Sequence, residues 1–455
     1  MSANGGDIVA AKTKNIDMVN GPLFKSIIRF SIPLVLSNLL QILYHAADVI
    51  VAGRFAGREA LAGVGSTGAI CSLLSALFLG ISVGVQIVAS QALGSGDKKR
   101  IENIVHTSVV ASVICGGIIS VIGIVFSDLI LAGVSVPENV IPQAKIYMQI
   151  TFIGRLPSMI YNFMSGILHA KGDSKTPMYI SLVSGAINVI LNLFFVIVFG
   201  MGAGGVALAT LIAQLITAVW ILIVLFKDNG PTRLYFKKLK IHKDSLLEIT
   251  RIGVPSGLQS IIFQFSNVIV QRSINSFGDA AIAGNSAASS VGDLFYALIA
   301  MFLTSCAVFV SQNYGAKNYK RINKTILYCL AGTAVLWAIE VVAIFTVGRP
   351  LLDIYAPGDT QAINMGYVRL LWVVGFYGLN MASDIMAASL RSIGYPIRSL
   401  ISSFIGVCGV RIMWVYTVFS AVGTFESLLL CFPLSWICTL IINTVMFMFA
   451  KRSLK

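Results

Sequence analysis

A single aspartate stands out in a stretch of sequence that otherwise carries no charge. Asp48 is the only formally charged residue between Phe30 and Gly53, a run of 24 residues. Polar residues precede it at helical spacing: Ser37, Gln41, Tyr44 and His45. Residues three or four apart share one face of a helix. If this helix crosses a membrane, an ionised aspartate costs at least about 2.5 to 3.5 kcal/mol unless it is paired, hydrated or protonated. Asp48 therefore indicates an ion site.

Polar residues on two later apolar segments could complete that site. They are Ser181, Ser184, Asn188 and Asn192 on one segment, and Thr210 and Gln214 on the next. Neither segment contains Lys or Arg, so a proton, a sodium ion or a cationic substrate is left as the partner of Asp48. Carboxylate, amide and hydroxyl oxygens suit a hard cation, and a carboxyl group can also take up a proton. A structural hydrogen bond, with Arg54 close by, is the alternative, and the residues alone leave these choices open.

The composition places these segments in a membrane. Only 11% of the 455 residues are charged and 56% are hydrophobic, which is far from the composition of soluble domains. About 20 apolar residues are needed to cross a hydrocarbon core. The apolar runs predict an all-α integral membrane protein with twelve transmembrane helices, near residues 30–53, 60–91, 104–126, 144–168, 178–200, 205–226, 252–275, 281–312, 325–347, 365–390, 399–420 and 427–450.

The net charge of +14 is best explained by the distribution of Lys and Arg on the two sides of the membrane. With the N-terminus in the cytoplasm, 25 of the 33 Lys and Arg residues fall on the inner side of these twelve spans. That is the positive-inside bias, and it predicts a multi-pass protein of the cell (inner) membrane with both termini cytoplasmic. The first 24 residues are polar and unlike a cleaved signal peptide. We expect no nucleic-acid partner.

The chain contains a weak internal duplication. "SQALGSGDKKRI" at 90–101 matches "SQNYGAKNYKRI" at 311–322 in six of twelve positions, and Pro33 pairs with Pro255 at nearly the same offset. The segment 168–172 likewise pairs with 390–394. The predicted domains are an N-terminal tail (1–24), an N-lobe (25–226), a basic cytoplasmic linker (227–251), a C-lobe (252–450) and a C-terminal tail (451–455). Six spans per copy is an even number, so a pseudo-twofold axis along the membrane normal relates the lobes.

Two such bundles facing one another leave a central cavity, which is a transporter architecture. The second copy keeps polar residues on its first span but has Val270 at the position equivalent to Asp48. Its candidate site residues are Gln264, Asn267, Asp293, Asn380, Asp384 and Arg411. A buried pair of Asp384 with Arg411 is one interpretation, and a second ion site is the other.

Residue patterns typical of a membrane enzyme are missing. The sequence has neither a nucleophile motif, nor a metal cluster, nor paired acids near an interface. Its seven cysteines lie in predicted spans without metal-ligand spacing: Cys71, Cys115, Cys306, Cys329, Cys408, Cys431 and Cys438. We expect no enzymatic activity, no cofactor and no dedicated metal.

From about Gly21 to its end, the chain resembles the multidrug and toxic compound extrusion (MATE) transporters of the MOP superfamily. The resemblance is carried by "GPLFKSIIRFSIPLVLSNLLQILYHAADVIVAG" at 21–53, by the repeated "SQ..G....KRI", by "HAKGDSKTP" at 169–177 with "LRSIGYP" at 390–396, and by "NVILNLFFV...GMGAGGVALAT" at 188–210. It implies twelve helices in two lobes around a V-shaped cavity, and secondary active export of organic cations or drugs against proton or sodium entry.

Carried over by position, Asp48 looks like the carboxylate of the family's N-lobe ion site. Asn188, Asn192 and Thr210 match its other members, with Gln41, Tyr44, His45 and Ser184 on the polar face nearby. The position of Asn192 is often aspartate in relatives, which favours a proton site over a sodium cage, with transient sodium at Asp48 still allowed. The C-lobe sodium site of another branch is incomplete here, since its two acids fall at Phe263 or Gln264 and at Asn380.

A flippase for a lipid-linked oligosaccharide, from the same superfamily, is the alternative function. Such a protein would place several cationic side chains in its cavity to meet a pyrophosphate. The candidates for this role are Arg155, Arg272, Arg369 and Arg411. The expected partners are small organic cations, protons or sodium, and membrane lipid, with the protein as a monomer.

Overall fold

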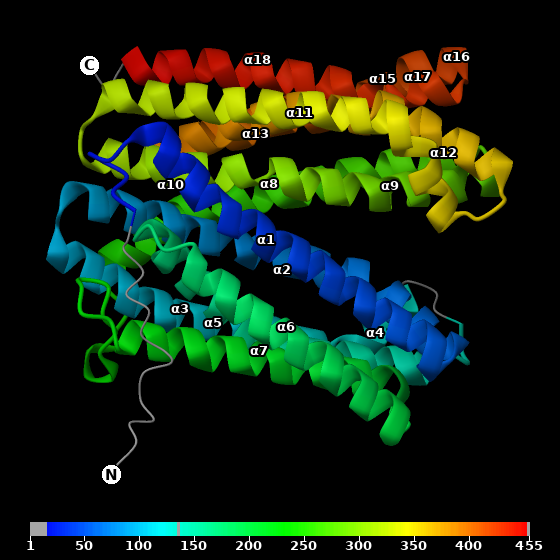
Figure 1. Ribbon diagram of the computed structural model, residues 1–455, viewed down its shortest axis with the longest axis horizontal. Helices are drawn as coiled ribbons and strands as arrows, with labels where there is room; N and C mark the ends of the chain where they lie inside the picture. The colour runs from blue at the N-terminus through cyan, green and yellow to red at the C-terminus, as the bar shows by residue number, and fades with distance from the viewer. Residues whose placement is uncertain (1–15, 134–136, 453–455) are drawn as a thin grey trace, which may run out of the picture.

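The computed structural model describes residues 16–133 and 137–452, and most of these residues are helical. Twelve long helical segments run side by side through the molecule (Figure 1). The elements of the first half are α1 (Leu23–Val51) continued by the π-helical turn η1 (Ala52–Ala56), α2 (Arg58–Ser95), α3 (Lys98–Val125), the short α4 (Ser127–Gly133), α5 (Ile141–Ala170), α6 (Lys175–Leu193) continued by η2 (Phe194–Val198), and α7 (Gly202–Phe226).

The second half repeats this plan with more interruptions. After the short η3 (Phe236–Lys238) in the linker, the first three long segments are α8 (Lys243–Asn275), α9 (Asp279–Ile299) continued by α10 (Met301–Gly315), and α11 (Tyr319–Tyr355). The fourth segment consists of α12 (Thr360–Trp372), η4 (Val374–Phe376) and α13 (Tyr377–Ser392), and the last consists of α17 (Phe425–Leu429) and α18 (Cys431–Arg452). Between them, the fifth segment consists of α14 (Pro396–Ser403), η5 (Phe404–Gly409), α15 (Val410–Trp414), η6 (Val415–Phe419) and α16 (Ser420–Val422).

The predicted twelve-helix, two-lobe fold is confirmed, because each predicted span falls on one of these segments. By length and hydropathy, ten of the twelve would be recognised as membrane-spanning in the described chain. The other two are α5 and α8, with 30 and 33 residues, long enough to extend about 45 to 50 Å. Both contain charged residues, such as Lys145 and Arg155 in α5 and Glu248 and Arg251 in α8, which lower their mean hydropathy.

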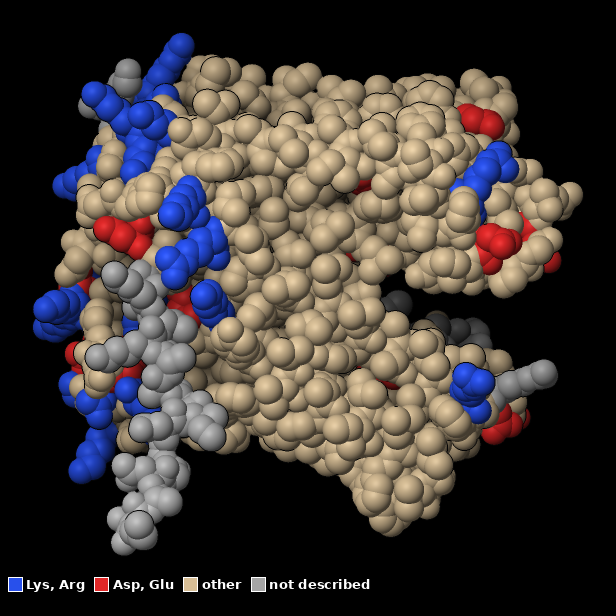
Figure 2. Space-filling view, in the orientation of Figure 1, with Lys and Arg blue, Asp and Glu red and all other residues tan. Residues whose placement is uncertain are grey.

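Two bundles make up the molecule. In the first, α5 packs against α2, α3 and α7, and α6 packs between α1 and α7. In the second, α9 packs against α12, α13 against α18, and α10 against α11. The bundles meet at one end and separate at the other, where a hollow opens between them (Figure 2).

Lysine and arginine gather at the end where the bundles meet (Figure 2, left). The connections α2 to α3, α5 to α6 and α7 to α8 lie at this end (Figure 1). The loop between α7 and α8 is folded against it: Lys238 Nζ lies 2.6 Å from Glu102 Oε1, and this bond holds the pKa of Glu102 below its usual value. The helix α8 begins at Lys243, so its first turns overlap the linker predicted at 227–251.

The first helix of each half packs on the other half over its basic-end portion. On α1, Phe30 contacts Phe309 of α10 edge to face at 5.8 Å, and Ser31 Oγ lies 2.6 Å from Ser305 Oγ. On α8, Ile249 belongs to the hydrophobic core of the first bundle. The outer portion of α1 packs on its own bundle, where Val51 joins a cluster with residues of α2, η2 and α7. Any movement of α1 therefore changes packing contacts in both bundles.

Glycines let α2 and α8 cross at close range between the bundles. Gly80 and Gly84 of α2 face Gly253 and Gly257 of α8, and each pair is spaced by four residues. Small residues at this spacing allow two membrane helices to bring their backbones together. A Cβ added at Gly253 would lie 2.6 Å from Ile81 Cα, which is too close for any real side chain.

Gly253→Ala should therefore destabilise the joined bundles. Overpacking of this kind costs about 1 to 3 kcal/mol, and we expect a lower midpoint of thermal unfolding in detergent. Gly117→Ala is the control, because a Cβ at Gly117 of α3 would meet nothing within 4 Å. Equal midpoints for the two variants would contradict the close crossing.

Candidate functional site

Asp48 is buried on the outer half of α1, with 8% of its surface exposed. The amide Nδ2 of Asn192 on α6 donates a hydrogen bond to Asp48 Oδ1. The hydroxyl of Thr210 on α7 lies 3.4 Å from Asp48 Oδ2. Asn188, oriented to satisfy its amide, donates to Asp48 Oδ1 at 3.1 Å and accepts from the backbone amide of Thr210 at 3.3 Å. The four residues predicted for the N-lobe site thus lie together, and Asp48 links α1 to α6 and α7.

The partners of Asp48 are all neutral. Four ion pairs join side chains in the described part of the chain, and none of them includes Asp48. Arg54, the cation closest in sequence, is exposed on η1. The carbonyl oxygen of Asn192 is buried and has no hydrogen-bond partner among the described residues. The site thus offers a carboxylate and an unused amide oxygen in an apolar surrounding.

The other predicted polar residues of this face have different roles. The Tyr44 hydroxyl donates to the backbone carbonyl of Leu182 at 3.0 Å, and the Ser184 hydroxyl donates to the carbonyl of Ser181 at 3.2 Å. These bonds tie α1 to α6 and satisfy α6 locally. Gln41 and His45 are exposed. None of these four side chains is among the hydrogen-bond partners of Asp48.

The residues predicted for a second site line one cavity of about 730 Å³ in the second half. They are Gln264 and Asn267 of α8, Asp293 of α9, Asn380 and Asp384 of α13, and Arg411 of α15. The cavity also reaches Gly80 of α2, so it faces the first bundle. The structure brings these residues together, and their role stays a prediction.

Asp384 and Arg411 do not form the ion pair that we considered. Arg411 Nη1 donates to Asn267 Oδ1 at 2.8 Å and Nε donates to Ser435 Oγ at 3.0 Å. Asp384 has a long contact of 3.5 Å from the Tyr296 hydroxyl. Neither residue is in an ion pair within the described chain.

Sequence reasoning missed Arg391 as a cavity residue. We assigned it to an inner loop, but it lies in the last turn of α13 and lines the same cavity. Its Nη1 donates to Gln259 Oε1 at 2.5 Å. The available signal was the duplication, because Arg391 is equivalent to His169 at the end of α5, within a helix.

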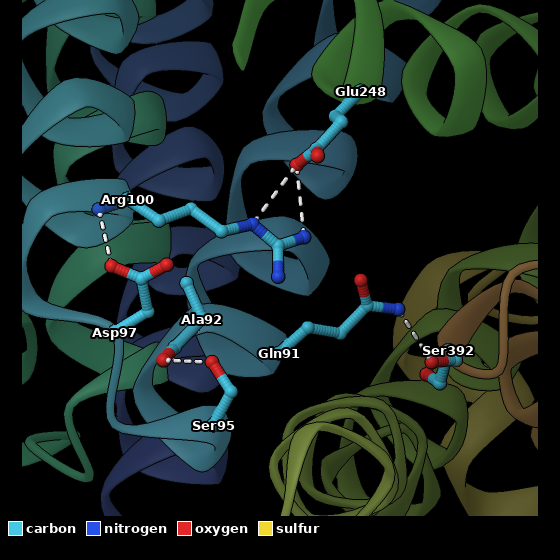
Figure 3. Close-up of polar contacts among 7 residues, drawn as sticks. All are labelled: Gln91, Ala92, Ser95, Asp97, Arg100, Glu248 and Ser392. Carbon is cyan, nitrogen blue, oxygen red and sulfur yellow. Dashed lines mark hydrogen bonds and ion pairs between the residues drawn. The ribbon is translucent and has the colours of Figure 1, made fainter. Parts of the chain in front are cut away.

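A matched pair of glutamines closes the basic end. Gln91 Nε2 on α2 donates to the backbone carbonyl of Ser392 at 2.8 Å (Figure 3). In the other half, Gln312 Nε2 on α10 donates to the carbonyl of Ala170 at 2.6 Å. Gln91 and Gln312 occupy the same position of the repeated "SQ..G", and Ala170 is equivalent to Ser392. Each half therefore donates one glutamine hydrogen bond to the equivalent backbone carbonyl of the other half.

An ion pair reinforces this closure. Two nitrogens of Arg100 on α3 donate to Glu248 Oε2 on α8, Nη2 at 2.9 Å and Nε at 3.3 Å (Figure 3). Along α2, Gln91 is eight residues past Val83, which lines the cavity, and so lies about 12 Å nearer the basic end. The closure therefore separates the cavity from the basic end.

Comparison with known proteins gives the class and the family. Two helical bundles around a central cavity in a membrane protein define a transporter architecture. The MatE family model matches residues 33–194 and 255–417, one match in each half. The chain therefore belongs to the MatE family of transporters, and the twofold match agrees with the duplication.

Named relatives cover most of the chain. A probable multidrug resistance protein, YoeA of Bacillus subtilis, is 27% identical over 399 residues, 86% of each chain. The multidrug export protein MepA of Staphylococcus aureus is 22% identical over 430 residues, 91% of this chain and 94% of its own. A solved outward-facing multidrug resistance MATE transporter of the MOP superfamily has a TM-score of 0.87 at 22% identity, covering 97% of this chain and 98% of its own. That structure shares the fold.

Loss of either glutamine should open the basic end. Gln91→Ala or Gln312→Ala removes a hydrogen bond between the halves. The closed state of the basic end should lose about 1 kcal/mol of stability, which shifts the equilibrium between closed and open states roughly fivefold toward the open state. Hydrogen exchange followed by mass spectrometry should then show faster exchange at the ends of α2 and α10. Gln149→Ala is the matched control, because Gln149 bonds to Ser127 within one bundle at 3.2 Å. Unchanged exchange in both glutamine variants would refute the closure.

Proposed function

We propose that this protein exports organic cations and drugs by secondary active transport, with Asp48 exchanging a proton for the substrate. Family membership and the names of the relatives support multidrug transport. The observation that carries the coupling is Asp48 itself: a buried carboxylate whose described partners are all neutral. An isolated charge in an apolar surrounding is costly, so a mobile cation must visit it.

The connection of Asp48 to both bundles explains how a proton could drive movement. The ionised carboxylate accepts bonds from Asn192 and Thr210, which hold the outer half of α1 against α6 and α7. A proton on Asp48 removes the charge that these bonds stabilise. The inner half of α1 packs on the second bundle, and Pro33 interrupts the backbone hydrogen bonds between the two parts. Weaker hydrogen bonds at Asp48 would therefore let α1 move, and because α1 packs on both bundles, its movement would change how the bundles are placed relative to each other.

Coupling requires the proton and the substrate to prefer different states. A ligand with equal affinity for both conformations shifts neither. In our proposal the ionised site favours the conformation that binds the cation, and a proton arriving from outside favours its release. One proton inward for one monovalent cation outward moves no net charge, so only the pH gradient drives it. A second inward proton would add about 2.3 kcal/mol per 100 mV, and Asp293 or Asp384 could bind it.

Sodium is a second candidate for the coupling ion. The unpartnered carbonyl oxygen of Asn192 lies beside Asp48, and the Thr210 hydroxyl adds another oxygen. Oxygen ligands of this kind suit a hard cation. The proton remains our preference, because the site has one carboxylate and few ligands.

A flippase for a lipid-linked oligosaccharide is the other candidate function. Three arginines line the cavity of the second half, as an anionic substrate would require. Two aspartates line the same cavity, and the named relatives are multidrug proteins. These observations favour drug export.

The orientation follows from the charges. We place the basic end in the cytoplasm, with both termini there, and the open hollow on the outside. In this arrangement the structure is an outward-facing state of a protein in the inner membrane.

Asp48→Asn should separate transport from coupling. In liposomes the variant should still exchange a fluorescent cation by counterflow, but concentrative efflux driven by an imposed pH gradient should be lost. Imposed sodium gradients, tested separately, identify the ion. Asp279→Asn is the control, because Asp279 is exposed in the first turn of α9. Undiminished gradient-driven efflux in Asp48→Asn would refute the proposed coupling.

A further inference from the structure

Three guanidinium groups line the cavity of the second half. They belong to Arg369 of α12, Arg391 of α13 and Arg411 of α15. Arg411 is 2% exposed, so its charge is deep within the bundle. The Nε atoms of Arg369 and Arg391 are buried and make no hydrogen bond to a described residue. The described residues therefore leave part of the hydrogen-bonding capacity of these two guanidiniums unused.

Two of these guanidiniums are held beside the same aromatic ring. The Cζ of Arg411 lies 4.4 Å from the centre of the Phe432 ring, and the Cζ of Arg369 lies 5.5 Å from it. Trp436 is 5.9 Å from Arg411. Stacking fixes the planes of the guanidiniums but leaves their charges uncompensated, and like charges held close together repel. The two guanidiniums therefore form a region of positive charge that packs on aromatic rings.

The acids of the cavity do not neutralise the arginines directly. Asp293 and Asp384 line the cavity, but no carboxylate oxygen of the described chain lies within ion-pair distance of the three guanidiniums. Arg411 bonds only to the neutral Asn267 and Ser435. With every group ionised, three positive charges face two negative ones. The surplus charge calls for an anion from outside.

The fold does not require these charges. The first half has an equivalent pocket of about 210 Å³, which includes Asn162 and His169. By the duplication, Asn162 is equivalent to Asp384 and His169 to Arg391. The same helix thus packs with neutral or charged residues at these positions. Packing of this helix therefore does not explain the charges of Asp384 and Arg391.

We infer that the second-half cavity binds the carboxylate of an aromatic amphiphile between the guanidiniums of Arg369 and Arg411. A planar carboxylate matches the fork of an arginine, and the ring of the ligand can pack on apolar side chains that line the cavity, such as Phe263 and Leu79. The inference rests on the proposed drug export and deepens it, because it assigns Arg369 and Arg411 as the residues that hold an acidic group of the substrate. Asp293 in the same cavity can face an amine of such a drug.

Binding of three matched probes to the purified full-length protein tests the inference. They are 2-naphthoate, its methyl ester and 2-naphthyltrimethylammonium, measured by isothermal titration calorimetry. We expect the naphthoate to bind more tightly than its ester. Arg411→Gln should weaken naphthoate binding about 10- to 100-fold, the range of a charge-assisted hydrogen bond. Arg411→Lys should weaken it less, because it keeps the charge but loses the fork.

Control variants separate this site from the coupling site. Arg272→Gln should bind naphthoate as the wild type does, because Arg272 is exposed near the end of α8. Coupled efflux of a fluorescent cation by Asp48→Asn is measured separately from naphthoate binding, so the two proposals can fail independently. If Arg411→Gln does not fold, as judged by size-exclusion chromatography, Arg369→Gln carries the same expectation.

Three results would overturn the inference. The first is equal affinity for naphthoate and its methyl ester. The second is wild-type naphthoate affinity in folded Arg411→Gln and Arg369→Gln variants. The third is a retained anionic phospholipid, detected by native mass spectrometry, that naphthoate does not displace, since this would assign the arginines to lipid.

Discussion

A charge inside an apolar helical bundle must find an opposite charge, and this constraint shapes both halves of the molecule. In the first half, Asp48 is bonded by amides and a hydroxyl that stabilise its charge without cancelling it. In the second half, Arg369 and Arg411 share an aromatic ring rather than a carboxylate. Ion pairs of the described chain occur where water is near, as with Arg100 and Glu248 at the basic end. In our proposal these interior charges bind mobile partners.

The duplication explains why the two ends of the molecule differ. Equivalent glutamines cross between the halves at the basic end, so one geometry is used twice. The first helix of each half also packs on the opposite half, which makes α1 and α8 part of both bundles. At the other end the bundles part and a hollow opens between them (Figure 2). A coupling residue on α1 is therefore well placed to act on both bundles at once.

Hydropathy predicted the twelve segments. Helical spacing predicted which polar residues share a face of each segment, because each such stripe belongs to one helix. It was the resemblance to the MATE family that selected Asn188, Asn192 and Thr210 from these stripes as the partners of Asp48. The partners of Arg411 could not be predicted, since they depend on how α8, α15 and α18 pack. Arg391 was misread as a loop residue because charge near a helix end usually marks an interface. The roles of Gln41 and His45 stay untested.

Proton exchange on substrate binding tests the central claim most directly. The binding of tetraphenylphosphonium to the purified protein can be followed calorimetrically in buffers of different ionisation enthalpy, which gives the number of protons exchanged. If a proton and a cation compete through Asp48, about one proton should leave for each cation bound by the wild type, and none in Asp48→Asn. Binding without proton release, or equal release from both proteins, would contradict the account.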